Sequence, residues 1–375
     1  MSAAEGRVRT FLRERGVPEA EIEQAVAQNR LHLLVVDAVL MPDEVRYTPL
    51  QVAELTGMPI ELLDRFWRAL GFPDVPREEP AFGVADVEAV TTLAGLLQLR
   101  VSEAEPAVQL ARVIGSSMSR IADAEISTAP ALRTPNESAE MAEQFVLTAD
   151  ATLPGMSRLL DYAWRRHLRA AARRAMVVTG FETGGGQAEL AVGFADLVGF
   201  TVLSQQLSEA ELAEMVGRFE ATAHDTVTVL GGRVVKMIGD EVMYVTDDVR
   251  VGTEVALSLA EAYSGDEILS EVRGALAFGT VVVRDGDYYG PVVNLASRMV
   301  NIAAPGTVLV SDVVHDALVE VPAFEWKSLR PRFLKDIGRV HMWRASRAGA
   351  ASRSDRSRLF GRPVPGARLG PDRPS

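Results

Sequence analysis

The sequence predicts an all-α domain followed by an α+β domain. Apolar residues recur with helical spacing over roughly the first 150 residues, whereas short apolar runs alternate with helices from Ala188 onward. Three consecutive glycines, residues 184–186, separate the two patterns. Strands interleaved with helices imply a sheet covered by helices, in an α+β or α/β arrangement. With 375 residues and 47% hydrophobic content, the chain is long enough for two cores.

Residues 1–155 are expected to form a bundle of short helices, because prolines interrupt the helical periodicity. Residues 1–150 carry 24 acidic residues against 13 Arg and no Lys, so they contribute 13 − 24 = −11 to the formal charge of −12. Residues 47–87 resemble the helix-turn-helix start of MerR-type regulators. A DNA-binding regulator is therefore one alternative, although a face that binds duplex DNA is normally basic.

Residues 156–184 predict a basic connecting helix and a glycine-rich joint. Five arginines alternate with Ala and Leu between Ala163 and Arg174. His167 lies in this run, and histidine changes its charge near neutral pH. We hypothesise that protonation of His167 alters how the helix docks on the acidic half, and thereby controls activity. The alternative is a solvated helix in which His167 is one more polar residue.

Residues 185–345 predict the α+β domain, and residues 346–375, rich in Arg, Pro, Gly and Ser, predict a disordered tail. A short helix and a hairpin are expected to close the domain. The expected strands are 189–195, 233–238, 241–246, 272–283 and 307–310. The expected longer helices are 208–229, 249–263 and 294–303.

Composition excludes several classes of function. The chain contains no cysteine, so disulfides, zinc–thiolate sites and cysteine nucleophiles are excluded. It has no apolar run long enough for a membrane span and no secretory core at its start. A net charge of −12 opposes binding to phosphate backbones. We therefore expect a cytoplasmic protein that does not bind nucleic acid.

The first polar motif is Phe194–Thr201, where Asp196 stands at the end of an apolar strand and a glycine-containing turn follows. Such a turn offers a carboxylate beside backbone N–H groups, which suits phosphate oxygens and a hard cation. The expected phosphate-binding residues are Leu197, Val198, Gly199, Phe200 and Thr201. The alternative is that Asp196 is only a turn or cap residue.

The second motif is Lys236–Glu241, between two strand-like runs. Its Gly-Asp pair indicates a tight hairpin with Asp240 at the tip and Lys236 in the first strand. Taken alone, this pair is a turn and nothing more. Together with Asp196, however, Asp240 supplies a second carboxylate that could converge on the same pair of metal ions.

The third motif is Asp287–Met299, in which Gly290 and Pro291 interrupt the chain before a predicted helix. Asn294 and Arg298 are four residues apart, so they share one face of that helix. An amide and a guanidinium would then point in the same direction. The alternative is that Asn294 caps the helix and Arg298 is a solvated surface residue.

The three motifs together resemble class III adenylate and guanylate cyclases over roughly residues 185–345, in a bacterial subgroup with a short dimerisation arm. The upstream half is similar to the helical regulatory domain of some actinobacterial cyclases in this subgroup. The resemblance implies a ferredoxin-like catalytic domain preceded by an all-α regulatory domain. Six polar positions occur in family order: Asp196, Lys236, Asp240, Asp287, Asn294 and Arg298.

The resemblance implies an adenylate cyclase that converts ATP to 3′,5′-cyclic AMP and pyrophosphate with two divalent metal ions. Asp196 and Asp240 match the metal-binding aspartates, and the Leu197 carbonyl is a plausible further ligand. Both Mg²⁺ and Mn²⁺ accept carboxylate and phosphate oxygens, so either metal suits the site. A related protein that binds nucleotide without turnover, as a sensor, is the second alternative.

The remaining positions match residues that contact the nucleotide. Lys236 and Asp287 match the purine-recognising pair, Asn294 the ribose-orienting asparagine and Arg298 the transition-state arginine. A lysine donor suits adenine N1 and an aspartate acceptor suits the N6 amino group, which favours ATP over GTP. In this family the metal aspartates come from one subunit and the other four residues from its partner. The resemblance therefore implies a homodimer with two equivalent sites.

Overall fold

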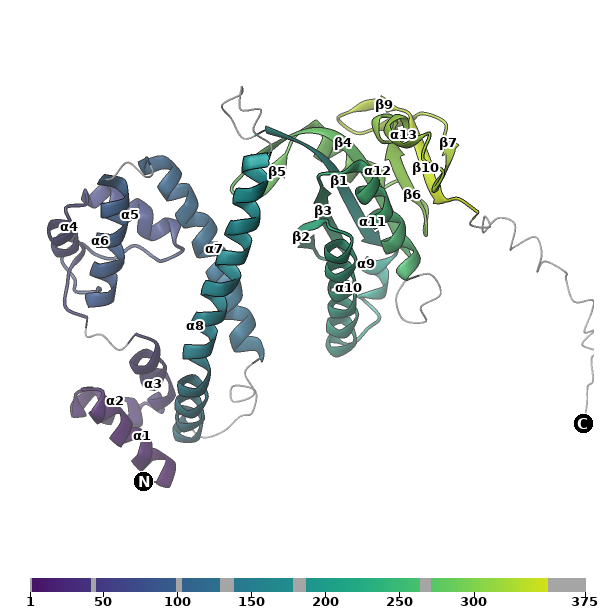
Figure 1. Ribbon diagram of the computed structural model, residues 1–375. Coiled ribbons are helices and arrows are strands. Elements are labelled where there is room, and N and C mark those ends of the chain that lie inside the picture. Colours follow the sequence, from purple (N-terminus) through teal and green to yellow (C-terminus); the bar gives the residue numbers. More distant parts are fainter. Residues whose placement is uncertain are drawn as a thin grey trace, which may run out of the picture. The chain divides into compact units, whose positions relative to one another are not determined.

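The computed structural model describes residues 2–41, 45–98, 103–128, 138–177, 187–263 and 271–349 (Figure 1). The chain divides into two compact units, Met1–Glu182 and Thr183–Ser375. Every described element of the first unit is helical apart from one isolated bridge, and the second unit combines a sheet with helices. The predicted fold class is therefore confirmed. None of the described helices combines the length and the apolar character needed to cross a membrane.

The first three helices share a core with the beginning of a long one. They are α1 (Ala3–Glu14), α2 (Glu19–Ala27) and α3 (Leu31–Leu40), and the long helix is α8 (Ser138–Val177). Their shared core contains Leu12, Ile22 and Val35, which are completely buried, and Ala142 of α8. Ser2 caps α1 by accepting a hydrogen bond from the Glu5 backbone N–H.

A helix-turn-helix follows, formed by α4 (Pro49–Thr56) and α5 (Ile60–Ala69). A capping box begins α4, and Gly57 ends it in the left-handed conformation with φ 68°. The arginines of this region are engaged by carboxylates. The ion pairs are Arg65–Glu105, Arg68–Asp74 and Arg77–Asp64. These guanidinium groups are accordingly less available to the phosphates of a DNA duplex.

Two further helices cover this motif, α6 (Val84–Gln98) and α7 (Ala104–Thr128). A separate small core joins α4, α5 and α6 around Val52, Leu63 and Phe82. On α7, Gly115 lies so close to α5 that an added Cβ would stand 2.3 Å from the Leu70 carbonyl oxygen. The small residue there allows α7 to approach the end of α5.

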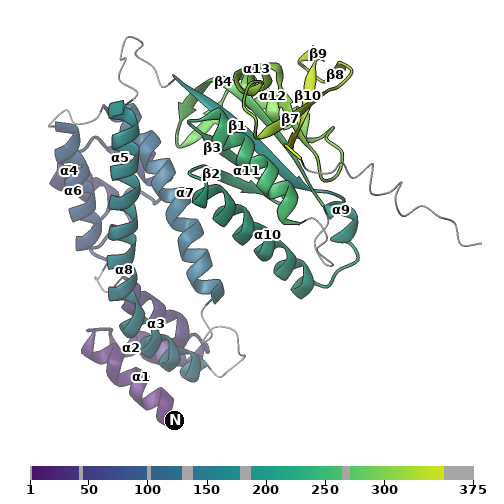
Figure 2. The ribbon, with the colours of Figure 1, turned by 45° about the vertical axis from the view of Figure 1, so that its right-hand side comes forward.

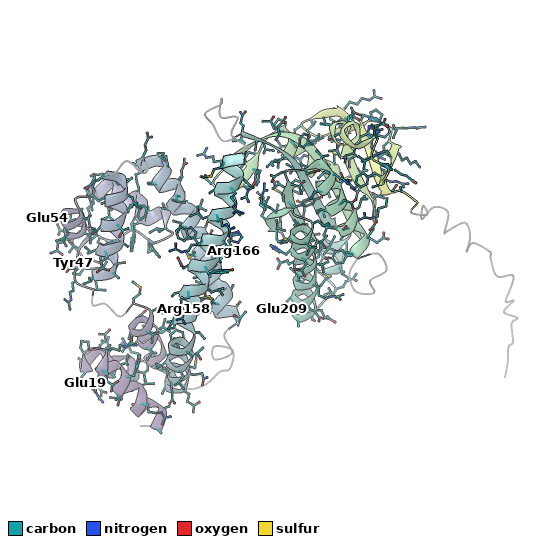
Figure 3. All side chains as sticks on the ribbon, viewed as in Figure 1. Glu19, Tyr47, Glu54, Arg158, Arg166 and Glu209 are labelled. Carbon is teal, nitrogen blue, oxygen red and sulfur yellow. The ribbon has the colours of Figure 1, made fainter. Side chains whose placement is uncertain are left out.

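Helix α8 continues as one element through the region predicted as a connecting helix. It spans 40 residues and contains Pro154. Its first part packs against α1 and α3, but none of its described side chains from residue 156 onward is buried. Arg158 and Arg166 project from this part (Figure 3), and Trp164 is 58% exposed. The predicted glycine joint lies outside the described residues.

The second unit is built on a mixed sheet in the order β2-β3-β1-β4-β6-β10-β7, with β5 paired to the end of β4. Only β4 and β6 are parallel; the other pairs are antiparallel. The strands are β1 (Gln187–Leu197), β2 (Arg233–Ile238), β3 (Glu241–Thr246), β4 (Val272–Arg284), β5 (Asp287–Tyr289), β6 (Val308–Ser311), β7 (Phe324–Ser328) and β10 (Met342–Arg347). A separate hairpin is formed by β8 (Arg332–Leu334) and β9 (Gly338–Val340).

Helices cover both faces of this sheet. The bounds are α9 (Phe200–Leu203), α10 (Glu209–Val229), α11 (Val249–Ala262), α12 (Pro291–Val300) and α13 (Asp312–Leu318). One core contains Phe219 of α10, Leu259 of α11 and Val314 of α13. The other contains Met299 of α12. Figure 2 shows α10 and α11 side by side over the first face. Because side chains alternate along β3, Tyr244 enters the first core and Met243 the second.

Three expectations differ from the structure. The helix expected at 294–303 begins at Pro291 and ends at Val300, because proline suits the first helical position. The short strand β5 was not expected, since its pairing partner is the end of a distant strand. Ser346 and Arg347, expected in the tail, instead complete β10, where they pair with Glu325 and Phe324 of β7. Residues 350–375 lie outside the described residues.

Candidate active site

Asp196 lies near the end of β1 and is 7% exposed. Its register partners are Glu241 on β3 and Arg273 on β4. The Arg273 guanidinium donates to Asp196 Oδ2 from Nε at 2.6 Å, and its Nη1 donates to the Asn301 carbonyl oxygen at 3.0 Å. Arg273 thus connects the strand-end carboxylate to the end of α12.

Asp240 lies in the two-residue turn between β2 and β3. Gly239 takes φ 65°, in the left-handed region that glycine adopts without strain, so the turn can close tightly. The Leu197 backbone N–H donates to the Asp240 carbonyl oxygen at 3.1 Å. This bond holds the turn against the end of β1 and brings Asp240 beside Asp196.

Negative charge is concentrated at this point of the sheet. Burial, reinforced by the charge of Asp196 and a hydrogen bond to it, raises the pKa of Asp240 above the usual range. Burial and then the charges of Asp196 and Asp240 raise the pKa of Glu241 to about 7. A bound divalent cation would neutralise this charge, so the donor set fits a hard metal ion.

The described residues contain no cluster of three or more His, Asp or Glu side chains able to hold a metal. The candidate ligands are therefore the paired carboxylates of Asp196 and Asp240, with the Leu197 carbonyl and substrate phosphates available to complete the shell. Sparse carboxylate sites of this kind suit Mg²⁺ and Mn²⁺, which retain water and bind phosphate oxygens.

The turn after Asp196 offers fewer backbone donors than the sequence predicts. The N–H of Leu197 is used by Asp240, and the N–H of Val198 donates to the Glu271 carbonyl oxygen at 2.9 Å. These two N–H groups therefore already have acceptors within the chain. Gly199, with φ 77°, precedes the short helix α9, whose first residues are Phe200 and Thr201. The N–H groups of residues 199–201 remain the candidate phosphate donors.

A β-bulge at Val235 determines where Lys236 points. On either side of the bulge, Val234 is opposite Tyr244 and Lys236 is opposite Met243. Met243 lies in the core that faces α12, so Lys236 points to that face too. If β2 instead alternated regularly through Val235, Lys236 would point to the same face as Val234, which is covered by α10 and α11.

Lys236 and Asp287 meet on the α12 side of the sheet. The lysine Nζ forms an ion pair with Asp287 Oδ2, and the two side chains are 37% and 25% exposed. Asp287 Oδ1 accepts a hydrogen bond from the Tyr288 backbone N–H at 2.8 Å. The structure thus brings together the two predicted purine-recognising residues, which are 51 positions apart in the sequence.

Asn294 and Arg298 lie on the exposed side of α12. Gly290 occupies the N-cap position, so Asn294 is inside the helix and does not cap it. Arg298 is 45% exposed in its side chain, and its Nη2 stands 3.8 Å from Asp336 Oδ2 in the turn between β8 and β9. Neither side chain is used to build the core, and both are available to a ligand.

The described hydrogen bonds and ion pairs connect Asp196, through Arg273, to the Asn301 carbonyl at the end of α12, but not to Lys236, Asp287, Asn294 or Arg298 within one chain. Arg273 and Glu241, which also surround Asp196, were missed by the sequence prediction. The available signal for Arg273 was a charged residue within an apolar strand-like run. Its contact with Asp196 depends on the pairing register of β1 and β4, which the sequence does not reveal.

Two family matches cover most of the chain. Residues 6–172 match the family described as the adenylate cyclase regulatory domain. Residues 186–344 match the family described as the adenylate and guanylate cyclase catalytic domain. The two matched regions correspond to the helical unit and the sheet-containing unit.

Relatives match both units together. The chain is 41% identical over 297 residues to an adenylate cyclase of Streptomyces coelicolor, covering 78% of this chain and 77% of the relative. It is 38% identical over 305 residues to an adenylate cyclase of Streptomyces griseus, covering 80% and 76%. It is 30% identical over 355 residues to a protein named pH-sensitive adenylate cyclase in Mycobacterium tuberculosis, covering 92% and 88%.

Proposed function

Because this chain belongs to the family of adenylate cyclases that carry an N-terminal regulatory domain, we propose that it converts ATP to 3′,5′-cyclic AMP and pyrophosphate. The family membership confirms the resemblance on which the sequence prediction depended. The observation that supports the substrate most directly is the meeting of Lys236 and Asp287 on the α12 side of the sheet. A donor and an acceptor placed together there suit the edge of an adenine base.

Base preference follows from hydrogen-bond polarity. Lys236 donates to adenine N1, and Asp287 accepts from the N6 amino group, after their mutual ion pair opens. Guanine presents the opposite polarity at both positions, which would leave a donor or an acceptor unpaired. An unsatisfied buried polar group costs about 1–3 kcal/mol, so the pair favours ATP by roughly tenfold or more.

The reaction joins the ribose 3′-oxygen to the α-phosphorus, breaks the bond from that phosphorus to the bridging oxygen of pyrophosphate, and releases the 3′-hydroxyl proton. Two metal ions, when bound, acidify the hydroxyl and neutralise phosphate charge. Asp196, near the end of β1, and Asp240, in the turn between β2 and β3, would hold those ions through their carboxylates. Arg273, whose guanidinium now neutralises Asp196, becomes available to phosphate oxygens when a cation takes over that carboxylate.

The α12 residues supply positioning and charge stabilisation. Asn294 orients the ribose so that its 3′-oxygen remains in line with the bond that breaks. Arg298 stabilises the charge that develops on the α-phosphoryl oxygens. Both side chains are exposed on α12 and free of core packing, as a ligand-contacting pair requires.

We propose that the active enzyme is a homodimer whose two sites each combine residues of both subunits. Within one chain, the carboxylate pair and the nucleotide-contacting residues form separate groups of contacts. A second copy, related by two-fold symmetry, would supply the missing half of each site.

Mixing two inactive variants tests this arrangement. Asp240→Ala and Arg298→Ala should each be inactive, yet their mixture should regain activity. A mixed dimer contains one site with both lesions and one with neither, so about a quarter of wild-type activity is expected from random pairing. A mixture of Asp240→Ala with Asp196→Ala is the matched control, and it should remain inactive because both lesions affect the same half-site. If heterodimers form but activity is not recovered, each active site would consist of residues from one chain only.

The helical unit is proposed to regulate the catalytic unit. One relative is named for pH sensitivity, and His167 lies in the exposed part of α8 that precedes the catalytic unit. Protonation there adds charge to a helix already rich in arginine, and can shift a two-state equilibrium of the helix.

The direct test is chromatographic detection of cyclic AMP and pyrophosphate after incubation of the full chain with ATP and Mg²⁺ or Mn²⁺. Equal amounts of both products are expected, with GTP converted more slowly. Omission of the metal should abolish the reaction. Tight nucleotide binding with no product under any metal condition would instead identify a sensor without turnover.

A further inference from the structure

The Arg273 guanidinium makes contacts in two directions. Its Nε and Nη2 atoms lie 2.6 and 2.5 Å from Asp196 Oδ2, and its Nη1 atom donates to the Asn301 carbonyl oxygen at 3.0 Å. The two contacts use different nitrogen atoms of one planar group. Loss of the contact with Asp196 therefore does not require loss of the bond to Asn301.

Asn301 is the C-cap residue of α12. The last carbonyl groups of a helix have no partner within the helix, and a cation placed there also interacts favourably with the helix dipole. Arg273 brings such a cation from β4. The Asn301 side chain closes the same end of the helix, because its Nδ2 atom donates to the Ser297 carbonyl oxygen at 2.8 Å. These two bonds hold the last turn of α12, which includes Arg298.

Strand β4 contacts α12 near both ends of the helix. Close to the beginning of α12, an added Cβ on Gly279 of β4 would stand 2.9 Å from Val292 Cγ2, so the glycine allows a close approach. At the other end, Arg273 of the same strand makes the bond to the C-cap residue. Asn294 and Arg298 lie between these two contacts along the helix. The strand that carries Arg273 therefore positions both side chains.

In the proposed homodimer, the two groups that Arg273 connects serve different active sites. Asp196 of one subunit contributes a metal-binding carboxylate to one site. Asn294 and Arg298 of that same subunit contribute to the other site. Arg273 thus joins, within one chain, two half-sites that work in separate active sites. A change at this arginine can reach a site to which Asp196 of its own chain does not contribute.

Building on the proposed homodimer, we propose that Arg273 is a positioning residue for α12 and therefore acts in both active sites. In one site it lies beside Asp196. In the other it acts at a distance, because it holds the end of the helix that presents Arg298 to the α-phosphoryl oxygens. The role requires an arginine, since a lysine carries one nitrogen in place of the three that Arg273 uses.

Mixtures of two inactive variants separate the two roles of Arg273. Asp240→Ala supplies an intact α12 and Arg298→Ala supplies intact carboxylates, so a mixed dimer of full-length chains has one working site. Arg273→Met is then added to one partner only. In the Asp240→Ala partner, it should lower the kcat of the working site about tenfold, because the end of α12 is no longer held. The KM for ATP should change by less than about twofold, since Arg298 acts on the transition state.

Arg273→Lys is the second variant, and it keeps a positive charge beside Asp196. Added to the Asp240→Ala partner, it should lower kcat as Arg273→Met does, because the ammonium group stays with the carboxylate and leaves the Asn301 carbonyl. If Arg273→Met does not fold, Arg273→Lys decides the question. Arg250→Met, at an exposed arginine of α11, is the matched control and should leave the activity of the mixture unchanged.

Hydrogen exchange of the full chain without nucleotide gives a readout that does not depend on turnover. In Arg273→Met and Arg273→Lys, the backbone amides in the last turn of α12 should exchange about tenfold faster than in the wild type, because that turn opens more often. Amides of α10 serve as the internal reference and should exchange at wild-type rates.

An undiminished kcat with either Arg273 variant in the Asp240→Ala partner would overturn the proposal. If Arg273→Met lowers activity only in the Arg298→Ala partner, Arg273 acts only beside Asp196. Unchanged hydrogen exchange at the end of α12 would also contradict the proposed role. If the starting mixture, with Arg273 intact, forms mixed dimers that have no activity, the homodimer arrangement itself fails, and this inference fails with it.

Discussion

The two units of this chain bury their apolar side chains in different ways. The catalytic unit has one sheet with a large core on each face, closed by α10, α11 and α13 on one side and α12 on the other. The helical unit has three separate small cores, and the described part of α8 after residue 156 has no buried side chain. The catalytic unit is therefore suited to holding residues in place, and the helical unit to changing its contacts.

Charges are also used differently in the two units. In the catalytic unit, Asp196 and Arg273 form an ion pair with side chains only 10% and 25% exposed. In the helical unit, the side chains of Arg13 and Glu19 are both 49% exposed. Exposed ion pairs contribute little, because water and salt screen them. Substitutions in the Asp196–Arg273 pair should therefore have larger effects than substitutions in the Arg13–Glu19 pair.

The largest effect is expected from the carboxylate pair. Asp196→Ala and Asp240→Ala should each lower kcat by at least about a thousandfold, because both metal binding and charge neutralisation are lost. Initial rates of cyclic AMP formation measure this. Asp225→Ala, at an exposed aspartate of α10, is the control and should behave as wild type. Near-normal turnover in either site variant would refute the metal assignment.

The next largest effect concerns the cores. Phe219→Ala, at a completely buried side chain of α10, should lower the free energy of unfolding of the catalytic unit by about 3–5 kcal/mol. Leu159→Ala, at a position of α8 that is 57% exposed, should change stability by less than about 0.5 kcal/mol. Denaturant unfolding of the two variants gives the comparison. A loss of several kcal/mol in Leu159→Ala would mean that α8 is covered by a partner.

A change of the two base-recognising residues should have an effect of intermediate size, on the preference for ATP over GTP. The double change Lys236→Glu and Asp287→Cys reverses the hydrogen-bond polarity of the pair. We expect the ATP-over-GTP ratio of kcat/KM to fall by about ten- to a hundredfold. Competition between the two nucleotides in one reaction measures the ratio. A folded double variant that keeps its preference for ATP would contradict the assignment of the purine site.

The smallest effect is expected in the helical unit. His167→Ala should change the shape of the pH–activity profile by a few-fold, because it removes an ionisable side chain from the exposed part of α8. Full-length wild type and variant are compared at constant ionic strength. Arg166→Ala controls for a simple loss of side-chain polarity at the neighbouring position. If the pH–activity profiles of wild type and His167→Ala superimpose, His167 is not the source of any pH response.

The sequence by itself determined the elements whose causes are local. Strands β2 and β3 were predicted at 233–238 and 241–246, the bounds that the structure has. Two short apolar runs and the Gly239–Asp240 turn were sufficient there, because both signals lie within a few residues. The all-α and α+β halves, and the family to which the chain belongs, could likewise be predicted from local patterns and the order of the motifs.

Only the tertiary structure decided how these elements serve the site. The bulge at Val235 directs Lys236 toward Asp287, which is 51 residues away, and Arg273 reaches Asp196 over 77 residues. Ser346 and Arg347 similarly extend β10 by pairing with Glu325 and Phe324 of β7. Each of these contacts joins segments that are distant in the sequence, so it stabilises the structure only once the sheet has brought the segments together. No local pattern in the sequence predicts such a contact.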